Sequence, residues 1–464
     1  MNKILFLHSL LTEEQVEFIN KVSKILQAKK TRLVLLGWDK EGKFNLHPEK
    51  IQLPVSITQF DTIYKKYIIR QDFEQYALNL KELVDRFDWW FPKSRNKKER
   101  SQRESFLHYH LHFFLKLINL HDPSLIIVWN GNDPRQLLLS RLCENLNIKT
   151  LFMERGTLPS LWFYDTKGVL GNSTVANFRF DNAVFDITYT NRLELYQNWY
   201  FHTSETLWEQ PARNEQINIK DKFGIKSGQE IILFVGQVDN DIQTKLFSPY
   251  FKSNKDAFQW FINYGVKDDY FVIGKHHPKS QVSVSHYREA IGINENIVWT
   301  DELKLDECLK VADFVVTVNS SVIFDALLFG KPVLSLGTTI LDGKNILYEY
   351  SPATFENLSR DFYSKNDLTK KIINFKFFLG YLLENNFIYF NDSNAAQEFS
   401  RILLSFEKDT TKKLSSDKSL KVLETYIVNK TKIENSHLRN RSVTSKLSKI
   451  FKKIRKRIGL IVGK

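Results

Sequence analysis

The amino-acid sequence predicts an α/β fold with two parallel-sheet domains and a cleft between them. Three stretches of the chain alternate strand, helix and strand, which is the pattern that builds parallel sheets. Between the first stretch and the other two, residues 195–228 lose strong periodicity and carry turn signals. Ligands of open α/β sheets bind at the carboxyl ends of the strands, so we expect chemistry in the loops that follow them.

The first strand, helix and strand unit lies in residues 125–153. Leu125–Trp129 is apolar throughout, a polar turn follows, and leucines then recur at helical spacing before the strand Thr150–Met153. Asp133 suits the N-cap of this helix, and Pro134 suits its first turn. The polar turn is therefore expected at the carboxyl edge of the first sheet.

The two later units lie beyond the predicted domain boundary. Their predicted strands are at residues 231–235, 270–273, 313–318 and 332–336. The helix predicted at 322–329 stops at Gly330, a good C′ residue, and Pro332 keeps it from continuing.

The chain is expected to have four parts. They are a first domain at 1–215, a second domain at 216–405, a polar linker at 406–440 and a basic helix at 441–464. In the last part, apolar residues recur at steps of three and four, and lysines and arginines fill the remaining positions. This pattern is typical of a helix on an anionic membrane surface, although an acidic partner or RNA would attract the same charges.

Composition and charge exclude several classes of protein. Of 464 residues, 42% are hydrophobic and 26% charged, which supplies packed cores and excludes a disordered chain. The formal net charge is +13, but nine positive charges and no acidic residue lie in Arg441 to Lys464, which leaves +4 for the rest. A mildly basic body with one basic tail argues against a protein that coats nucleic acid.

The two cysteines and the apolar runs indicate the kind of cellular compartment in which the protein works. Cys143 and Cys308 each lie in an apolar helical pattern, which excludes a disulfide framework or cysteine-rich zinc module and fits a reducing compartment. The apolar start of the chain, interrupted by His8, predicts a first core strand rather than a signal segment. No run of about 18 apolar residues occurs, so we expect a soluble or peripheral protein.

Asn319-Ser-Ser321 lies between a predicted buried strand and a helix. Unpaired backbone N–H groups and the helix dipole favour an anion such as phosphate at such a position. A simple serine N-cap explains the same residues. Asp325, one helical turn further on, is placed to accept the hydroxyls of a ribose in the same pocket.

Lys275-His-His-Pro278 follows another predicted strand. Pro278 biases His277 toward an extended backbone that can aim its imidazole into a cleft. A surface loop with two incidental histidines fits the pattern equally well. Metal binding is less favoured, because adjacent histidines in a turn rarely converge on one ion.

Gly236-Gln-Val-Asp-Asn-Asp241 also follows a predicted strand. Asp239 and Asp241 form the Asp-x-Asp pattern by which many sugar transferases hold a divalent ion, although a polar turn at a strand end gives the same pattern. A carboxylate at this place could instead be a nucleophile or general base at the anomeric carbon of a sugar.

Glu154 and Arg155 come directly after the strand that closes the first unit. A guanidinium beside a carboxylate can form a structural pair, or it can bind an anionic group of a substrate. The residues alone leave both roles open.

Six polar segments follow one another between residues 120 and 340. They are Trp129-Asn-Gly131, Glu154-Arg-Gly-Thr-Leu-Pro159, Asp165-Thr-Lys-Gly-Val169 with Asn172-Ser173, Gly236-Gln-Val-Asp-Asn-Asp241, Lys275-His-His-Pro278, and Asn319-Ser-Ser321 to Gly330-Lys-Pro-Val333. Together they resemble the bacterial capsule polysaccharide synthesis family of Kdo transferases. That family moves 3-deoxy-manno-octulosonic acid (Kdo) from CMP-Kdo to a glycan or glycolipid.

The resemblance implies a GT-B architecture of two Rossmann-like domains, with CMP held mainly by the second. It implies that Asp241 attacks the anomeric carbon in a retaining reaction and that Glu154 is the acid/base. No cofactor or metal is expected, because helix ends and basic residues stabilise the leaving phosphate. The residues assigned to the nucleotide sugar are Gln237, Lys275, His277, Pro278, Asn319, Ser320, Ser321 and Asp325, and those assigned to the substrate are Asn130 and Arg155.

Departures from the family pattern leave the donor sugar open. Family members often have a second acidic residue and an aromatic near Glu154, where this chain has Arg155 and Thr157, and a glutamate where Asp325 stands. The predicted function is Kdo transfer in capsule or O-antigen synthesis, at the cytoplasmic face of the bacterial inner membrane. The expected partners are a nucleotide sugar, a glycan or lipid-linked glycan acceptor and the membrane surface, without nucleic acid. The alternatives are an inverting, sialyltransferase-like CMP-sugar enzyme and a non-catalytic scaffold that binds glycan or nucleic acid.

Overall fold

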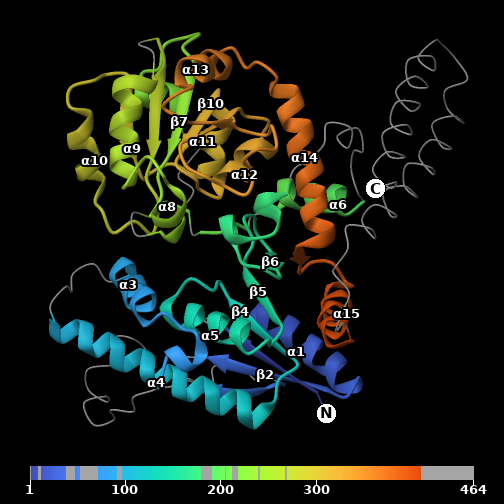
Figure 1. Ribbon diagram of the computed structural model, residues 1–464. Coiled ribbons are helices and arrows are strands. Elements are labelled where there is room, and N and C mark those ends of the chain that lie inside the picture. The colour runs from blue at the N-terminus through green and yellow to red at the C-terminus, as the bar shows by residue number, and fades with distance from the viewer. Residues whose placement is uncertain are drawn as a thin grey trace, which may run out of the picture.

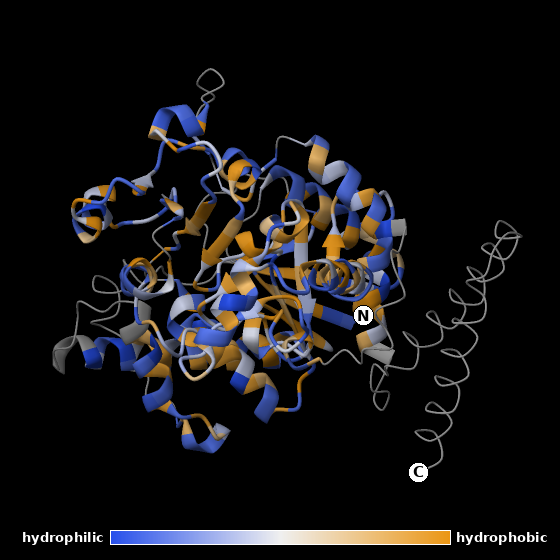
Figure 2. Cartoon of the chain, turned by 90° about the horizontal axis from the view of Figure 1, so that it is seen from above, coloured by the Kyte–Doolittle hydropathy of each residue, from blue (hydrophilic) through white to orange (hydrophobic). Residues whose placement is uncertain are grey.

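A computed structural model shows two sheet domains, one above the other, with helices around each sheet (Figure 1). The described residues are 2–8, 12–37, 47–52, 72–90, 97–178, 191–203, 205–208, 210–211, 218–238, 241–266 and 269–408. Hydrophobic residues gather in the central strands, and hydrophilic residues are frequent on the outer faces of the helices (Figure 2). The predicted basic helix at 441–464, and the predicted linker after residue 408, lie outside the described residues.

The first sheet has seven strands in the order β13-β6-β5-β4-β1-β2-β3. The five strands from β5 to β3 are parallel, whereas β6 runs antiparallel to both of its neighbours. Strand β1 confirms the predicted first core strand, and β4 and β5 confirm the first predicted unit. The strands are β1 (Asn2–Leu7), β2 (Thr31–Gly37), β3 (Glu49–Gln52), β4 (Leu125–Trp129), β5 (Thr150–Arg155), β6 (Leu161–Asp165) and β13 (Phe387–Tyr389).

Helices cover both faces of the first sheet. Helix α1 (Glu13–Ala28) packs on one face, and α3 (Leu80–Trp90), α4 (Lys97–His121) and α5 (Pro134–Asn145) pack on the other. Helix α5 begins as predicted, because the Asp133 carboxylate accepts from the N–H of Arg135 and Pro134 occupies the first turn. The shorter elements are η3 (Glu74–Tyr76), η4 (Leu170–Asn172), η5 (Val175–Asn177) and α6 (Asn191–His202).

The second sheet has six parallel strands in the order β12-β11-β10-β7-β8-β9. All five residues of β7 are buried, as expected for a central strand of a sheet that is covered on both faces. The strands are β7 (Ile231–Val235), β8 (Phe271–Lys275), β9 (Ile297–Thr300), β10 (Phe314–Thr317), β11 (Val333–Ser335) and β12 (Tyr348–Glu349). The helices are α7 (Ile219–Phe223), α8 (Ile242–Phe247), α9 (Asn254–Trp260), α10 (Val284–Ile291), α11 (Leu305–Val311), α12 (Val322–Leu328), α13 (Phe355–Tyr363) and α14 (Leu368–Asn385), with a π-helical turn η6 at Phe261–Gly265.

After α14 the chain returns to the first domain (Figure 1). Strand β13 pairs with β6, and helix α15 (Ala395–Lys408) packs beside α1. Phe399 and Leu403 of α15 are buried in the same core cluster as Phe18 and Ile19 of α1. Residues 387–408, most of which the sequence assigns to the second domain, therefore lie against the first sheet. Apolar side chains on one face of α15 account for this position, because they need a partner surface.

The two domains share a core. One buried cluster joins residues of the first domain, such as Leu161 and Tyr196, with residues of the second, such as Ile273 and Leu382. This arrangement of one parallel sheet and one mainly parallel sheet confirms the predicted GT-B fold class. Across the described ranges, no helix combines the length and hydropathy needed to cross a membrane.

Candidate active site

The candidate site lies between the domains, where loops that follow central strands of both sheets meet. The first sheet supplies Asn130, directly after β4, and Glu154, near the end of β5. The second sheet supplies the loop to Asp241 after β7 and the loops after β8 and β10. The negative charge of Asp241 acts on Glu154 across the gap. The structure thus brings the two predicted catalytic carboxyl groups together.

Glu154 is held by Asn130. Nδ2 of Asn130 donates a hydrogen bond to Oε1 of Glu154 at 2.7 Å. Asn130 has a φ of +68°, in the left-handed region that asparagine tolerates better than most residues. Burial raises the pKa of Glu154 to about 8, and the charge of Asp241 adds to the rise, while the Asn130 bond and the charge of Arg155 oppose it. Glu154 therefore carries a proton at neutral pH.

Asp241 begins helix α8 as its N-cap. Its Oδ1 accepts from the backbone N–H of Gln243 at 3.0 Å. Burial raises the pKa of Asp241, while the Gln243 N–H and the positive charge of Arg155 oppose the rise. The cap fixes the direction of this carboxyl group. Asp239, the other residue of the Asp-x-Asp pattern, lies outside the described residues, and the part of the chain that is described holds no group of three His, Cys, Asp or Glu placed for a metal ion.

Arg155 reaches across to the second domain through Trp208. The guanidinium carbon of Arg155 lies 4.0 Å from the centroid of the Trp208 ring. The His277 ring meets the same indole edge to face, with centroids 5.5 Å apart. Trp208 lies between α6 and α7, in the segment where the sequence shows only turn signals. The sequence analysis missed this residue because a single tryptophan in such a segment carries no pattern.

Lys275 and His277 form the basic side of the site. Lys275 is 4% exposed, and its Nζ donates to the carbonyl oxygen of His276 at 3.1 Å. Burial lowers the pKa of Lys275. Nδ1 of His277 accepts from the N–H of Lys279 at 3.0 Å. Burial, and then the charge of Lys275, lowers the pKa of His277 to about 4, so its imidazole is neutral at pH 7, and Pro278 beside it is exposed.

Gln237 and Asn319 join the loop after β7 to the loop after β10. Nε2 of Gln237 donates to Oδ1 of Asn319 at 3.1 Å, and the backbone N–H of Asn319 donates to Oε1 of Gln237 at 2.9 Å. Nδ2 of Asn319 donates to the carbonyl oxygens of Gln243 at 3.0 Å and Phe247 at 3.2 Å. These bonds use both amide hydrogens of Asn319. They give it a supporting position, which differs from the predicted direct contact with the nucleotide.

Ser320 and Ser321 lie at the start of α12, as expected. Oγ of Ser320 accepts from the N–H of Val322 at 3.3 Å, whereas the side chain of Ser321, the N-cap residue, makes no capping bond. The hydroxyl of Tyr200 in α6 donates to Oδ1 of Asp325. Burial raises the pKa of Asp325 to about 7, and the Tyr200 bond opposes this. The Asp325 carboxyl thus joins α6 to α12, and its contact with a ribose stays a prediction.

The loop after β6 is organised by a buried carboxylate. Asp165 accepts from the N–H groups of Lys167 at 2.7 Å and Thr174 at 2.9 Å. A Cβ on Gly171 in this loop would lie 2.4 Å from the Phe247 ring of α8. This close approach explains the glycine and places the loop at the contact between the domains.

Comparison with known proteins shows that part of this chain is similar to one family. Residues 185–377 match the family described as capsule polysaccharide biosynthesis protein. The matched residues make up less than half of the chain. Over 164 residues the chain is 30% identical to the capsule polysaccharide export protein KpsS of Escherichia coli, a match that covers 33% of this chain and 40% of KpsS. The match therefore spans less than half of the relative's length.

Solved structures show a distant likeness to the chain. The β-Kdo 2,7 transferase of Thermosulfurimonas dismutans KpsC is 16% identical, with a TM-score of 0.36, and the alignment covers 72% of this chain and 98% of that one. The β-Kdo 2,4 transferase of the same KpsC is 15% identical, with a TM-score of 0.40, covering 58% and 85%. The UDP co-structure of S. aureus MnaA is 12% identical, with a TM-score of 0.36, covering 89% and 100%.

The family match covers one side of the site. Asp241, His277 and the serines at 320–321 lie inside the matched residues, whereas Asn130 and Glu154 lie outside them. The similarity to the capsule polysaccharide biosynthesis family therefore extends only over the second-domain half of the site. The residues of the first-domain half lie outside the match, and the fold of this chain brings them to the site.

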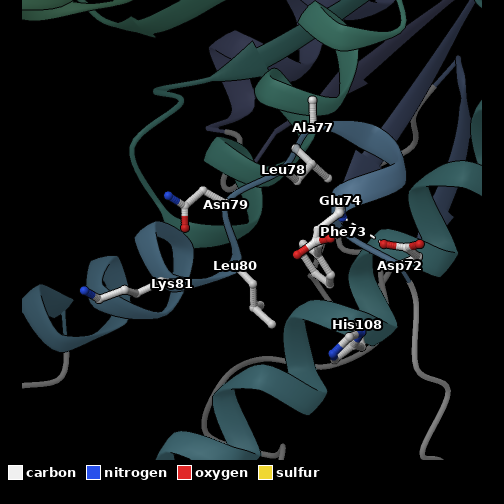
Figure 3. A pocket seen from close by; sticks show the side chains of 9 residues that line it. All are labelled: Asp72, Phe73, Glu74, Ala77, Leu78, Asn79, Leu80, Lys81 and His108. Atoms are coloured by element: carbon white, nitrogen blue, oxygen red, sulfur yellow. Dashed lines mark hydrogen bonds between the residues drawn. The ribbon is translucent and has the colours of Figure 1, made fainter.

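A separate hollow of about 720 Å³ lies in the first domain, between η3, α3 and α4 (Figure 3). The Phe73 and His108 rings meet there edge to face, with centroids 4.9 Å apart. Asn145, at the far end of α5 from the candidate site, donates to the carbonyl oxygen of Tyr76 beside it. None of the predicted site residues lines this hollow.

Proposed function

We propose that the chain is a retaining glycosyltransferase that moves Kdo from CMP-Kdo to a glycan or glycolipid acceptor in capsule or O-antigen synthesis. The observation that carries the proposal is the pair of carboxyl groups from opposite domains, Glu154 and Asp241, of which the charge of Asp241 acts on Glu154. Two such groups with different environments are the means by which sugar-transferring sites separate an acid/base from a nucleophile. The family match over residues 185–377 supports the same assignment.

In the first step, Asp241 attacks the anomeric carbon of the donor sugar. A bond forms between its carboxylate oxygen and that carbon, and the bond from the carbon to the phosphate oxygen of CMP breaks. Glu154, protonated at neutral pH because burial raises its pKa to about 8, gives its proton to the departing phosphate. The sugar is then held as an ester of Asp241.

In the second step, the acceptor hydroxyl attacks the same carbon from the face that CMP has left. Glu154, now a carboxylate, takes the proton of that hydroxyl, and the bond to Asp241 breaks. Two displacements at one carbon retain its configuration. Glu154 is again protonated, so both residues return to their starting states.

The departing CMP is stabilised by the second domain in this proposal. The buried ammonium group of Lys275 has one hydrogen-bond acceptor among the described residues, the carbonyl of His276, which leaves donors for a phosphate. The neutral imidazole of His277 and the hydroxyls of Ser320 and Ser321 complete the predicted contacts. We propose no metal, because fixed donors and a positive charge can stabilise the leaving group.

Calorimetric titration tests this proposal. The purified chain is titrated with CMP, CDP, UDP and GDP, with and without EDTA. We expect selective binding of CMP that EDTA does not change and that His277→Ala removes. His286→Ala, an exposed histidine on α10, is the matched control and should bind CMP normally. A preference for another nucleotide, or a metal requirement, would contradict the donor assignment, and no nucleotide binding would favour a scaffold.

Mass spectrometry separates a retaining from an inverting mechanism. Incubation with CMP-Kdo without acceptor should leave Kdo attached to the protein, and peptide mapping should place it on Asp241. An inverting, sialyltransferase-like enzyme would use a carboxylate as base and would carry no sugar. Release of CMP without any adduct in rapidly quenched samples would therefore favour the inverting alternative.

A further inference from the structure

Trp208 is the residue at which the two halves of the site touch. Its carbonyl oxygen accepts from the hydroxyl of Thr206 at 2.7 Å and from Nε2 of Gln210 at 3.1 Å. Oε1 of Gln210 in turn accepts from the N–H of Leu305, at the start of α11, at 3.2 Å. The backbone of Trp208 is therefore tied to the second domain, while its ring receives Arg155 from the first.

We infer that Trp208 is a positioning residue, which holds the Arg155 guanidinium beside Glu154 and Asp241 and links it to His277. The inference rests on the proposed function, since it assigns a role within that same site. Trp208 acts through Arg155, so it is not itself a catalytic residue. The Trp208 ring would hold the positive charge of Arg155 in place. No hydrogen bond described here holds that charge.

The physical argument starts from the freedom of Arg155. This side chain reaches the surface, and a long arginine side chain samples many rotamers unless a partner restrains it. The face of a tryptophan ring is the strongest aromatic partner for a guanidinium. At 4.0 Å from the centroid, the Trp208 ring supplies such a restraint.

The charge held in this way acts on three titratable groups of the site, Glu154, Asp241 and His277. Arg155 favours the charged forms of Glu154 and Asp241 and disfavours the charged form of His277. The other groups that bear on this cluster are Asn130, which bonds Glu154, and Lys275, His276 and Lys279, whose charges act on His277. A nucleotide phosphate bound at His277 would therefore meet a positive charge whose position depends on Trp208.

A double-mutant cycle tests this inference. CMP affinity is measured by calorimetry for the parent chain, Arg155→Ala, Trp208→Ala and the double variant. We expect each single change to weaken CMP binding about fivefold, as the loss of one cation–π contact predicts. In the Arg155→Ala background, Trp208→Ala should cost almost nothing further, because the group that it positions is already gone. Trp208→Phe should restore most of the affinity, because it keeps an aromatic face.

A second readout excludes a merely structural role. The release of CMP from CMP-Kdo is followed against pH, and its alkaline limb reports Glu154. Trp208→Ala and Arg155→Ala should both move this limb to higher pH, because the charge that opposes the raised pKa is lost. Trp260→Phe is the matched control, since Trp260 packs on Tyr350 and Phe355 in the second domain and should change neither readout.

The outcomes separate this inference from the proposed function. If the parent chain binds CMP but the two substitutions weaken binding additively, Trp208 does not act through Arg155 and the inference is overturned. If the parent chain binds none of the nucleotides, the proposed function is wrong. In that case the same cycle in urea unfolding decides the inference, because additive midpoints would show that the two side chains are not coupled.

Discussion

The two halves of the site are built differently. In the second domain, Gln237 and Asn319 bond each other reciprocally, and Asn319 also reaches two carbonyl oxygens of α8. In the first domain, Asn130 gives Glu154 one hydrogen bond, and Arg155 rests on an aromatic ring. A buried polar network whose partners are all present is rigid, whereas a buried carboxyl group with few partners titrates at an unusual pH.

This difference indicates a division of labour. Under the proposed function, the second domain would bind the nucleotide through loops that hydrogen bonds already fix. The first domain carries the group whose proton moves, and burial raises the pKa of that group, Glu154, to about 8. The four substitutions below change one half or the other, and they are arranged from the largest expected effect to the smallest.

Asp241→Asn should give the largest loss, because it removes the proposed nucleophile from the edge of the second domain. We expect sugar transfer to fall on the order of a thousandfold or more, as for other essential groups of a catalytic pair. The fold should be kept, because asparagine caps a helix as well as aspartate does. Transfer is measured as product formed from CMP-Kdo.

Asp133→Asn is the matched control for this change. Asp133 caps α5 through the N–H of Arg135 at 2.9 Å, in the same way as Asp241 caps α8. It should retain nearly all transfer. Full transfer by Asp241→Asn would mean that the second domain supplies no nucleophile, and the comparison between the two halves would fail.

Glu154→Gln should give the next largest loss, on the order of a hundredfold, which is typical of removing a general acid or base. In the parent chain, transfer should hold below pH 8 and decline above it, because Glu154 must start protonated and burial raises its pKa to about 8. Glutamine does not titrate, so the residual transfer of the variant should lack this alkaline limb. The exposed Glu144→Gln on α5 is the control and should keep the limb.

The elements that the sequence predicted well are those with an unbroken apolar pattern. The strands β1, β4, β7, β8 and β10 are buried central strands, and their apolar runs are visible in the sequence. The return of β13 and α15 to the first sheet could not be predicted. Strand β13 has three residues and pairs with β6, which is distant in sequence, so the residues around β13 carry no signal of the pairing. The apolar face of α15 does not indicate which of the two sheets the helix covers.

The predicted site residues were found by their position after strands, and their roles depended on contacts between domains. Glu154 lies near the carboxyl end of β5 and Asp241 follows β7, and the sequence indicates both of these strand ends. Asp325 accepts a hydrogen bond from Tyr200, in a helix more than a hundred residues earlier, which no pattern around Asp325 indicates. Trp208 was missed for the same reason, since its partners Arg155 and His277 are distant in sequence.

Asn319→Ala tests the second-domain half of the site, in which hydrogen bonds fix the loops. Its side chain is buried and satisfies carbonyl oxygens at the end of α8, so its loss should lower the free energy of unfolding by about 2–3 kcal/mol and weaken CMP binding. Asn374→Ala is a matched control, because Asn374 is equally buried and donates to carbonyl oxygens of the loop at residues 344–345. It should lower stability similarly, measured by urea unfolding, with CMP affinity unchanged. Equal losses of affinity in both variants would show that the network supports the domain in general and not the nucleotide loops.

Asn130→Gly tests the first-domain half of the site, where Glu154 receives one hydrogen bond. This substitution should have the smallest effect. Glycine accepts the φ of +68° at this position without strain, so the change removes the hydrogen bond and little else. That bond favours the charged form of Glu154, so its loss should raise the pKa of Glu154 further and move the alkaline limb of transfer upward by up to about one pH unit. Asn147→Gly, another asparagine with a positive φ, is the matched control and should leave the limb in place. A downward shift of the alkaline limb in Asn130→Gly would mean that Asn130 stabilises the protonated form of Glu154. The pKa of Glu154 would then be set by this hydrogen bond rather than by burial.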